Sequence, residues 1–161
     1  MENEEDSLTK VHIDLPNHWA SGGESIWALS LGDDLYEIRN APFYAYGLNW
    51  GDIVRAHSDD PELKPEVREV VKRSGNKTLR VFFNEELSEE AQESILSSLQ
   101  NLDVSWERAD ESYVAIDVHP EADYDAVCGK FAELENQGIF EYETCEARVA
   151  GSFDDAPSDD E

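Results

Sequence analysis

The order of hydrophobic periods in the second half of the chain constrains the fold most. Two stretches repeat apolar residues three to four positions apart, as on one face of a helix: 88–101 and 123–137. Four stretches are short and rich in apolar residues, as strands are: 78–83, 104–108, 113–118 and 139–149. The order is strand, helix, strand, strand, helix, strand, which predicts a split βαβ, or ferredoxin-like, unit.

Individual residues mark the ends of both helices. Ser88 suits the N-cap of the first helix, because its hydroxyl can accept a backbone N–H bond. Glu89 and Glu90 then face the positive end of the helix dipole. Gly138 is placed to end the second helix. Both helices of such a unit cover one face of the sheet, so the first half of the chain is the expected cover of the other face.

The first half shows the alternation typical of strands. The predicted strands are 26–31, 35–39, 53–57, 67–72 and the shared strand 78–83. Five short strands with tight connections predict a small bent β-sheet or barrel. Because the shared strand closes this module and opens the next, we expect the two modules to be fused through one core, in an α+β fold.

The predicted domain organisation has four parts. Residues 1–23 form an acidic flexible segment, disordered over its first nine residues, with a short edge strand at 11–15 ended by Pro16. Residues 24–77 form the β-rich, barrel-like module, and residues 78–150 form the ferredoxin-like module. The acidic tail, 151–161, is expected to be disordered.

Residues 40–52 are too irregular for a helix and too rich in Gly and Pro for a plain strand, which predicts a structured crossing between strands. Its aromatic residues could pack at the joint between the modules or line a ligand pocket. The pocket hypothesis names Tyr44, Tyr46, Trp50 and Asp52. The position of the crossing favours packing for Phe43, Tyr46 and Trp50, and a turn-capping carboxylate for Asp52 over a catalytic one.

The same crossing carries a family resemblance. The runs 25–28, 36–40, 41–56, 70–75 and 78–83 resemble a bacterial family known only as a domain of unknown function, number forty-two sixty-five. The aromatic run with its Gly51-Asp52 is the specific part, and the acidic ends lie outside the shared pattern. The resemblance implies a common fold. It implies no activity, ligand or catalytic residue.

The net charge of −26 is unevenly distributed. Residues 25–83 are nearly neutral, whereas residues 84–161 carry 23 acids and three bases. Such a field repels nucleic acid and anionic membranes and attracts basic proteins over ~8–10 Å at ordinary salt. The alternative is that the acids confer solubility or adapt the chain to a salty cytoplasm. Residues 1–6 lack the apolar region of a secretory signal, and no apolar run is long enough to span a membrane, so we expect a cytoplasmic protein.

No catalytic, metal or cofactor motif is present. The four histidines, His12, His18, His57 and His119, have no ligand spacing, and we expect Cys128 and Cys145 to be small buried hydrophobes. No nucleophile elbow or phosphate loop occurs. A basic cluster lies in the β-rich half: Arg55, Arg68, Lys72, Arg73, Lys77 and Arg80. We expect these bases to pair with the chain's own carboxylates rather than to bind an anion.

These observations favour an acidic protein-binding module, most concretely an immunity protein or inhibitor that blocks the active surface of a basic toxin such as a nuclease. The residues expected to contact the partner are Trp106, Glu107, Asp110, Glu111 and Tyr113, with Trp106 or Tyr113 exposed as anchors. The alternative is a small-ligand-binding or enzymatic domain that uses the aromatic pocket of the crossing.

Overall fold

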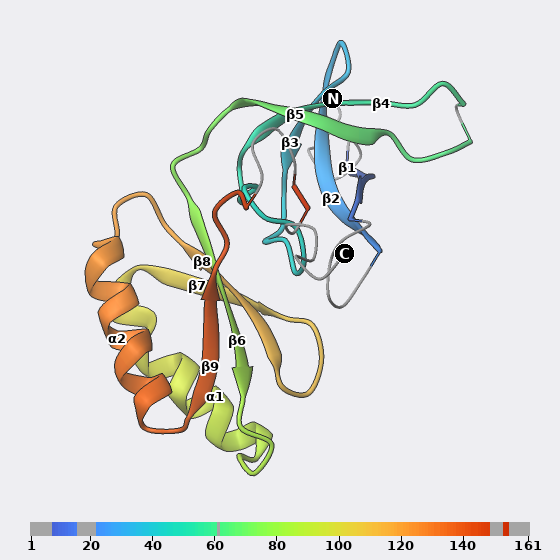
Figure 1. Cartoon of the computed structure of the whole chain (residues 1–161). Coiled ribbons are helices and arrows are strands. Elements are labelled where there is room, and N and C mark those ends of the chain that lie inside the picture. The colour runs from blue at the N-terminus through green and yellow to red at the C-terminus, as the bar shows by residue number, and fades with distance from the viewer. Residues whose placement is uncertain (1–7, 16–21, 61, 149–152, 155–161) are drawn as a thin grey trace.

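The structure is a computed structural model, and it describes residues 8–15, 22–60, 62–148 and 153–154 (Figure 1). The described part is a mixed α/β fold with two sheets and two α-helices. The strands of the first sheet are β1 (Leu8–Asp14), β2 (Gly23–Gly32), β3 (Leu35–Ile38), β4 (Ile53–His57) and β5 (Glu66–Lys72). The elements of the second half are β6 (Lys77–Phe83), α1 (Glu89–Ser98), the 3₁₀ turn η2 (Gln100–Leu102), β7 (Val104–Arg108), β8 (Tyr113–Val118), α2 (Tyr124–Asn136) and β9 (Phe140–Thr144).

The first sheet is a closed barrel of β1 to β5, so the first half does form a small barrel. The prediction of a shared strand is wrong: the strand 78–83, which is β6, pairs with β8 and β9 of the second sheet, and β1 takes its expected place in the barrel. Its strands follow one another as antiparallel neighbours, and a parallel contact between His12 of β1 and Glu66 of β5 closes the ring. The predicted edge strand is therefore not an edge. It also begins at Leu8, so the expectation of disorder is wrong for residues 8 and 9. Residues 1–7, Pro16 and His18, and the predicted tail apart from residues 153 and 154, lie outside the described residues. The expectation of disorder is wrong for these two as well, because the Phe153 carbonyl accepts the Tyr46 N–H at 2.8 Å and Asp154 is buried.

The second sheet has the strand order β7-β8-β6-β9, with every neighbouring pair antiparallel. Both helices pack on one face of it, as Figure 1 shows at lower left. The reason lies in the alternation of β6: Leu79, Val81 and Phe83 join the same buried cluster as Leu96 of α1 and Phe131 of α2. Arg80, between them, points to the opposite face and reaches the crossing of the first half. The first half therefore covers the face that the helices leave open.

The helix ends follow the local signals. The Ser88 hydroxyl accepts the Ala91 N–H at 3.1 Å, as expected of an N-cap, and Gly138 after α2 has a φ of +77°. The first helix is shorter than predicted, because its last turn tightens into η2. The last strand is shorter too: β9 ends at Thr144, whereas the prediction ran to residue 149, which lies outside the described residues.

The buried apolar residues form two clusters, one inside the barrel and one between the second sheet and its helices. The expectation of a common core for the two modules stays a prediction. Between the clusters lie charged and polar side chains that are almost fully buried, and these organise the candidate site. No helix among the described residues is long and apolar enough to cross a membrane.

Candidate functional site

The crossing between β3 and β4 is held by the side chain of Glu24, which reaches it from β2. The Glu24 carboxylate accepts N–H bonds from Phe43 at 2.6 Å and from Tyr44 and Ala45 at 3.0 Å each. Burial raises the pKa of this carboxyl above its ordinary value, against the effect of the three N–H bonds. An irregular segment needs partners for its backbone groups, and Glu24 supplies them.

Arg80 holds the carbonyl side of the same segment. It is fully buried, and its guanidinium donates to the carbonyl oxygens of Pro42 at 3.1 Å, Ala45 at 2.9 Å and Tyr44 at 3.2 Å. It also pairs with Glu143 of β9 at 3.1 Å. The two halves of the molecule are thus joined by a charged group whose donors are used within the chain.

Three more bases of the predicted cluster are paired with acids of the chain. Arg55 pairs with Glu69 at 3.0 Å, and Arg68 pairs with Glu66 at 3.2 Å. Arg73 lies 3.5 Å from the Asp52 carboxylate. The prediction that these bases pair with the chain's own acids is confirmed for Arg55, Arg68, Arg73 and Arg80.

Asp52 has the turn-capping role that its position after Gly51 suggested. Its two carboxylate oxygens accept the N–H groups of Asn49 and Ser74, each at 2.9 Å, and the residue is fully buried. It therefore ties the crossing to the turn between β5 and β6. A carboxylate committed in this way has little freedom to act as a general base.

The four residues of the predicted ligand pocket differ in their surroundings: Trp50 lines a cavity, whereas Tyr46 and Asp52 are fully buried. Tyr46 is buried, with its ring 4.7 Å from the Arg80 guanidinium, and Tyr44 stacks on Tyr113 at 5.8 Å. Trp50 is 36% exposed, so the prediction that it packs as a buried aromatic residue at the joint is wrong. The physical reason is local: Trp50 sits in the turn closed by the Asp52 N–H bond to the Asn49 carbonyl, while Leu48 already fills the barrel core.

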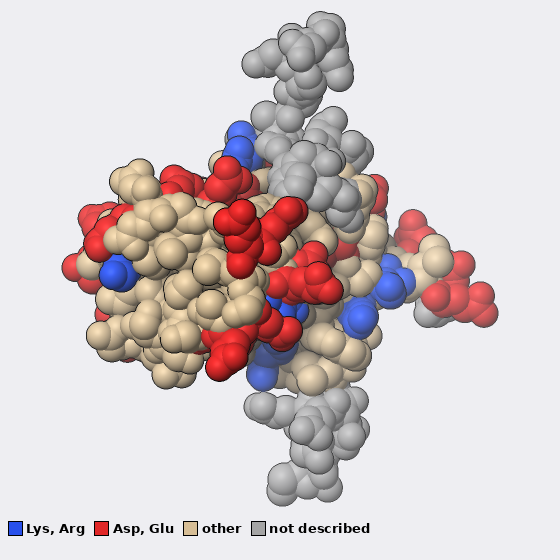
Figure 2. Space-filling view, turned by 90° about the horizontal axis from the view of Figure 1, so that it is seen from below, with Lys and Arg blue, Asp and Glu red and all other residues tan. Residues whose placement is uncertain are grey.

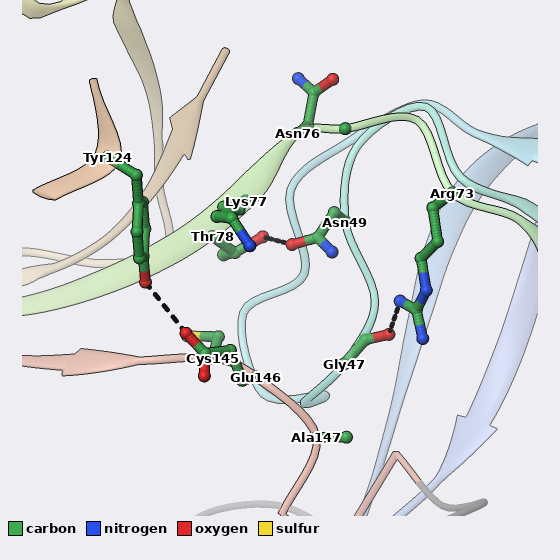
Figure 3. Close-up of a pocket in the computed structure, with 11 residues that line it drawn as sticks. Gly47, Asn49, Arg73, Asn76, Lys77, Thr78, Tyr124, Cys145, Glu146 and Ala147 are labelled. Atoms are coloured by element: carbon green, nitrogen blue, oxygen red, sulfur yellow. Dashed lines mark hydrogen bonds between the residues drawn. The ribbon is translucent and has the colours of Figure 1, made fainter. Parts of the chain in front are cut away.

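A cavity of about 320 Å³ lies where the crossing meets the β5–β6 turn, the start of α2 and the segment after β9 (Figure 3). We call it the joint cavity, and its lining residues include Asn49, Arg73, Lys77, Thr78, Tyr124 and Cys145. Its polar groups largely bind one another: Thr78 donates to Asn49 at 2.8 Å, and Arg73 donates to the Gly47 carbonyl at 2.6 Å. Burial raises the pKa of the Cys145 thiol to about 12, so this cavity holds no activated nucleophile.

A second cavity, of about 260 Å³, opens beside the turn that carries Trp50. We call it the indole cavity, and it is lined by Trp50, Asn76, Ser105, Trp106, Glu107, Asp117 and His119. It unites Trp50, from the predicted ligand set, with Trp106 and Glu107, from the predicted partner set. Asn76, Ser105, Asp117 and His119 were missed as site residues. A signal existed for Asp117, which is the one charged residue in the strand sequence Tyr-Val-Ala-Ile-Asp-Val.

The polar groups of the indole cavity form a connected set. Asn76 donates from Nδ2 to Asp117 Oδ1 at 2.9 Å, and its side chain points away from the joint cavity in Figure 3. Ser105 Oγ lies 3.0 Å from His119 Nε2, on the same side of the imidazole as Asp117 Oδ2 at 3.7 Å. The acid beside Nδ1, Glu121, is 3.9 Å away, beyond hydrogen-bond distance. The serine and histidine therefore lack the oriented acid of a hydrolytic triad.

Both carboxyls of the indole cavity sit in a desolvated setting. Burial raises the pKa of Asp117 and of Glu107 above their ordinary values. The charge on Asp117 raises the pKa of Glu107 further, while a hydrogen bond from the Ala41 N–H at 2.5 Å opposes the rise. No Lys or Arg is among the described residues that line this cavity.

The rest of the predicted partner set divides in two. Asp110 and Glu111 are exposed in the β7–β8 turn, where Asp110 accepts the Tyr113 N–H at 2.9 Å. Tyr113 is only 2% exposed, so its expected role as an exposed anchor is wrong. Its ring stacks on Phe82 at 4.2 Å, and its hydroxyl donates to the Phe43 carbonyl across the joint between the halves.

The surface of the second half is strongly acidic. Residues 84–148 contain 18 acids and three bases. Each of these bases is already paired: Arg108 with Glu93 at 2.5 Å, Lys130 with Glu133 at 3.8 Å, and Arg148 with Glu143 at 3.4 Å. Figure 2 shows the result from below, with many red side chains and little blue on the helical half at left. Among the described residues, no group of three His, Cys, Asp or Glu side chains could hold a metal ion.

Sequence comparison decides the family. A family described as Domain of unknown function (DUF4265) matches residues 24–142, which is most of the chain. The chain belongs to this family. The resemblance expected from the aromatic crossing is therefore confirmed. A comparison with curated proteins finds no match.

A solved structure shares the fold. It is described as "Novel crystal structure of a hypothetical protein from Neisseria gonorrhoeae", and it aligns with a TM-score of 0.69 at 17% sequence identity. The alignment covers 86% of this chain and 95% of the other. At that identity the likeness shows the arrangement of the chain and carries no function.

Proposed function

We propose that the protein is an acidic protein-binding module, most concretely an immunity protein or inhibitor that neutralises a basic toxin such as a nuclease by covering its active surface. One observation carries the proposal. All three bases of residues 84–148 are paired within the chain, while 15 of the 18 acids there are exposed. The excess negative charge is therefore available to a positive partner surface.

The acidic surface also offers apolar contact area. An open groove of about 630 Å³ lies at the end of the second sheet, and its aromatic lining is Phe82, Phe83 and Phe140. Phe83 and Phe140 belong to the buried core, so Phe82 is the one of the three that is partly exposed there. Glu85, Glu135 and Glu141 rim the groove. Affinity at protein interfaces comes from buried aromatic anchors, and charge mainly sets the association rate and the choice of partner. The exposed part of Phe82 supplies an apolar contact, and the three acids at the rim supply negative charge, to a basic partner.

The test begins with the basic proteins encoded next to the gene, each titrated against the purified chain at low and high salt. We expect one of them to bind, with an affinity that falls steeply as salt rises. The triple variant Glu85→Gln, Glu135→Gln, Glu141→Gln should weaken binding. The matched control Asp59→Asn, Asp60→Asn, Glu62→Gln removes the same charge from the β4–β5 turn and should not. Binding that is indifferent to salt, or equal losses in both variants, would refute the proposal.

A second candidate is a small-ligand-binding domain. The observation that favours it is the indole cavity, which joins Trp50 and Trp106 from the two halves of the molecule around a buried carboxylate. A ligand should raise the melting temperature of the wild type more than that of a folded Trp50→Ala variant at the same ligand concentration. If no ligand of any class shifts the melting temperature, this candidate fails.

We also infer that the predicted module, 78–150, is a ferredoxin-like unit. The strand order β7-β8-β6-β9, with two helices packed on one face, supports this assignment. The division into modules at residue 77 and a cytoplasmic location stay predictions.

A further inference from the structure

The residues that line the indole cavity suit a positively charged ligand, and they favour one class of cation over others. Trp50 is 36% exposed, a large apolar surface for a side chain in a turn. Trp106 is partly buried in β7. Indole is the aromatic group that attracts cations most strongly, so two indoles at one cavity favour a positive ligand.

The charged groups of the lining point the same way. Glu107 and Asp117 carry the formal charges of the cavity, and the Asp117 side chain is only 9% exposed. Among the described residues, Asp117 Oδ1 is bound by the neutral Asn76 amide, and Glu107 Oε2 is bound by the Ala41 N–H. Glu107 Oε1 has no hydrogen bond within the part of the chain that the structure describes. The one basic side chain of the lining, His119, lies 3.7 Å from Asp117 Oδ2 and is a cation only when protonated. With a neutral His119, both carboxylates therefore lack a positive partner among the described residues.

The base nearest to Trp50 does not meet this need. Arg39 lies 6.0 Å from the Trp50 ring, but its guanidinium is paired with Glu37 at 2.7 Å and does not line the cavity. A cation that enters the cavity would instead meet a lining that contains two carboxylates and two indoles.

We propose that the indole cavity binds a guanidinium group, held between Trp50 and Trp106 and hydrogen-bonded to Glu107 and Asp117. A guanidinium is planar, stacks on aromatic rings and presents several N–H donors to carboxylates, whereas an ammonium is a compact and strongly hydrated charge. The volume of about 260 Å³ is several times the ~30 Å³ share of a water molecule, which leaves room for the group and a short stem. This inference deepens the second candidate function and is independent of the acidic-surface proposal.

The test is calorimetric titration with matched probes. Methylguanidinium represents a free small molecule, and the capped tripeptide Ala-Arg-Ala represents a protein side chain. The same tripeptide with citrulline in place of arginine keeps the shape and removes the charge. We expect saturable binding of methylguanidinium or of the arginine peptide. The citrulline peptide should bind at least about tenfold more weakly, because neutral hydrogen bonds are roughly half as strong as charged ones. If the arginine peptide binds clearly more tightly than methylguanidinium, the natural guanidinium belongs to a protein side chain. If the two bind equally tightly, it belongs to a small molecule.

Single-residue variants distinguish binding in the cavity from attraction by the overall negative charge of the protein. Asp117→Asn should weaken probe binding by about tenfold, and Trp50→Ala, in an exposed position, by about threefold to fivefold. Glu111→Gln removes one charge from the neighbouring β7–β8 turn, outside the cavity, and should change binding by less than about twofold. Urea unfolding of each variant verifies that it is folded. Absence of saturable binding of both probes, equal binding of the citrulline peptide, or equal effects of Asp117→Asn and Glu111→Gln would overturn the assignment. None of these results depends on a toxin partner.

Discussion

The buried guanidinium of Arg80 allows the joint between the two halves to be tested quantitatively. Arg80→Met keeps a side chain of similar length and removes the charge and its donors. The variant leaves the carbonyls of Pro42, Tyr44 and Ala45 without this donor, and it leaves Glu143 without its closest cation. Removing one partner of a buried ion pair costs about 3–5 kcal/mol.

The groups around Arg80 decide where in that range the loss of unfolding free energy should fall. Glu143 keeps the Tyr46 hydroxyl at 2.9 Å and Arg148 at 3.4 Å, so its charge is not left alone. The three carbonyls lose hydrogen bonds to a charged donor, worth about 1.5–3 kcal/mol each in isolation, although such losses are not additive. We therefore expect the free energy of unfolding to fall by about 3–4 kcal/mol.

The assay is urea unfolding monitored by circular dichroism, with two controls. Arg80→Lys retains the charge without the planar fork and should fall between the wild type and Arg80→Met. Arg55→Met breaks the exposed pair with Glu69 and should cost no more than about 1 kcal/mol. A loss below about 1 kcal/mol for Arg80→Met, or a loss equal to that of Arg55→Met, would show that the guanidinium does not hold the joint.

Three further predictions follow from particular residues. Trp50→Ala should cost only about 1–2 kcal/mol, well below the ~3–5 kcal/mol of a fully buried aromatic residue, and a loss in the higher range on urea unfolding would contradict its exposed position. Gly47→Ala and Gly32→Ala both place a side chain at positive φ, at +76° and +87°, but only the new Cβ at position 47 would meet another atom, Ala147 Cβ at 2.9 Å. Gly32→Ala should therefore lower the free energy of unfolding by about 1–2 kcal/mol, and Gly47→Ala by about 1–3 kcal/mol more than that. Equal losses for the two variants would show that Ala147 does not lie against Gly47. Asp59, then Asp34, raise the pKa of His57 above 6.5 by accepting its ring N–H groups at 3.0 and 3.1 Å. The stability gained there is complete below pH 6.5 and is lost as the pH rises through the raised pKa. NMR titration of His57 should show that Asp59→Asn lowers this pKa, and an unchanged value would refute the pairing.

Local signals in the sequence were sufficient for most of the secondary structure. Ser88 and Gly138 act at the helix ends through hydrogen bonds and dihedral angles within a few residues, so their roles do not depend on the rest of the fold. Asp52 is similar, because the turn it caps begins three residues before it. The end of the last strand was predicted less well, since pairing with β6 decides how far β9 runs.

The candidate site was predicted only in pieces. Trp50 and Trp106 are 56 positions apart, and they were assigned to two different sites. The structure brings them to one cavity because the crossing packs over the second sheet. Tyr113 was expected at the surface, but its strand lies in the interior of the second sheet, between β7 and β6. Exposure depends on which elements cover a strand, and alternation alone does not reveal that.

The sequence by itself determined the order of strands and helices, the family, and a net charge of −26 concentrated after residue 84. These properties depend on composition, on short-range periodicity and on residues close together in the chain. The tertiary structure alone decided that Arg80 and Glu24 are buried at the joint and that two indoles line one cavity with Asp117. Such contacts join residues tens of positions apart, and their energies depend on burial, which no local pattern of residues specifies.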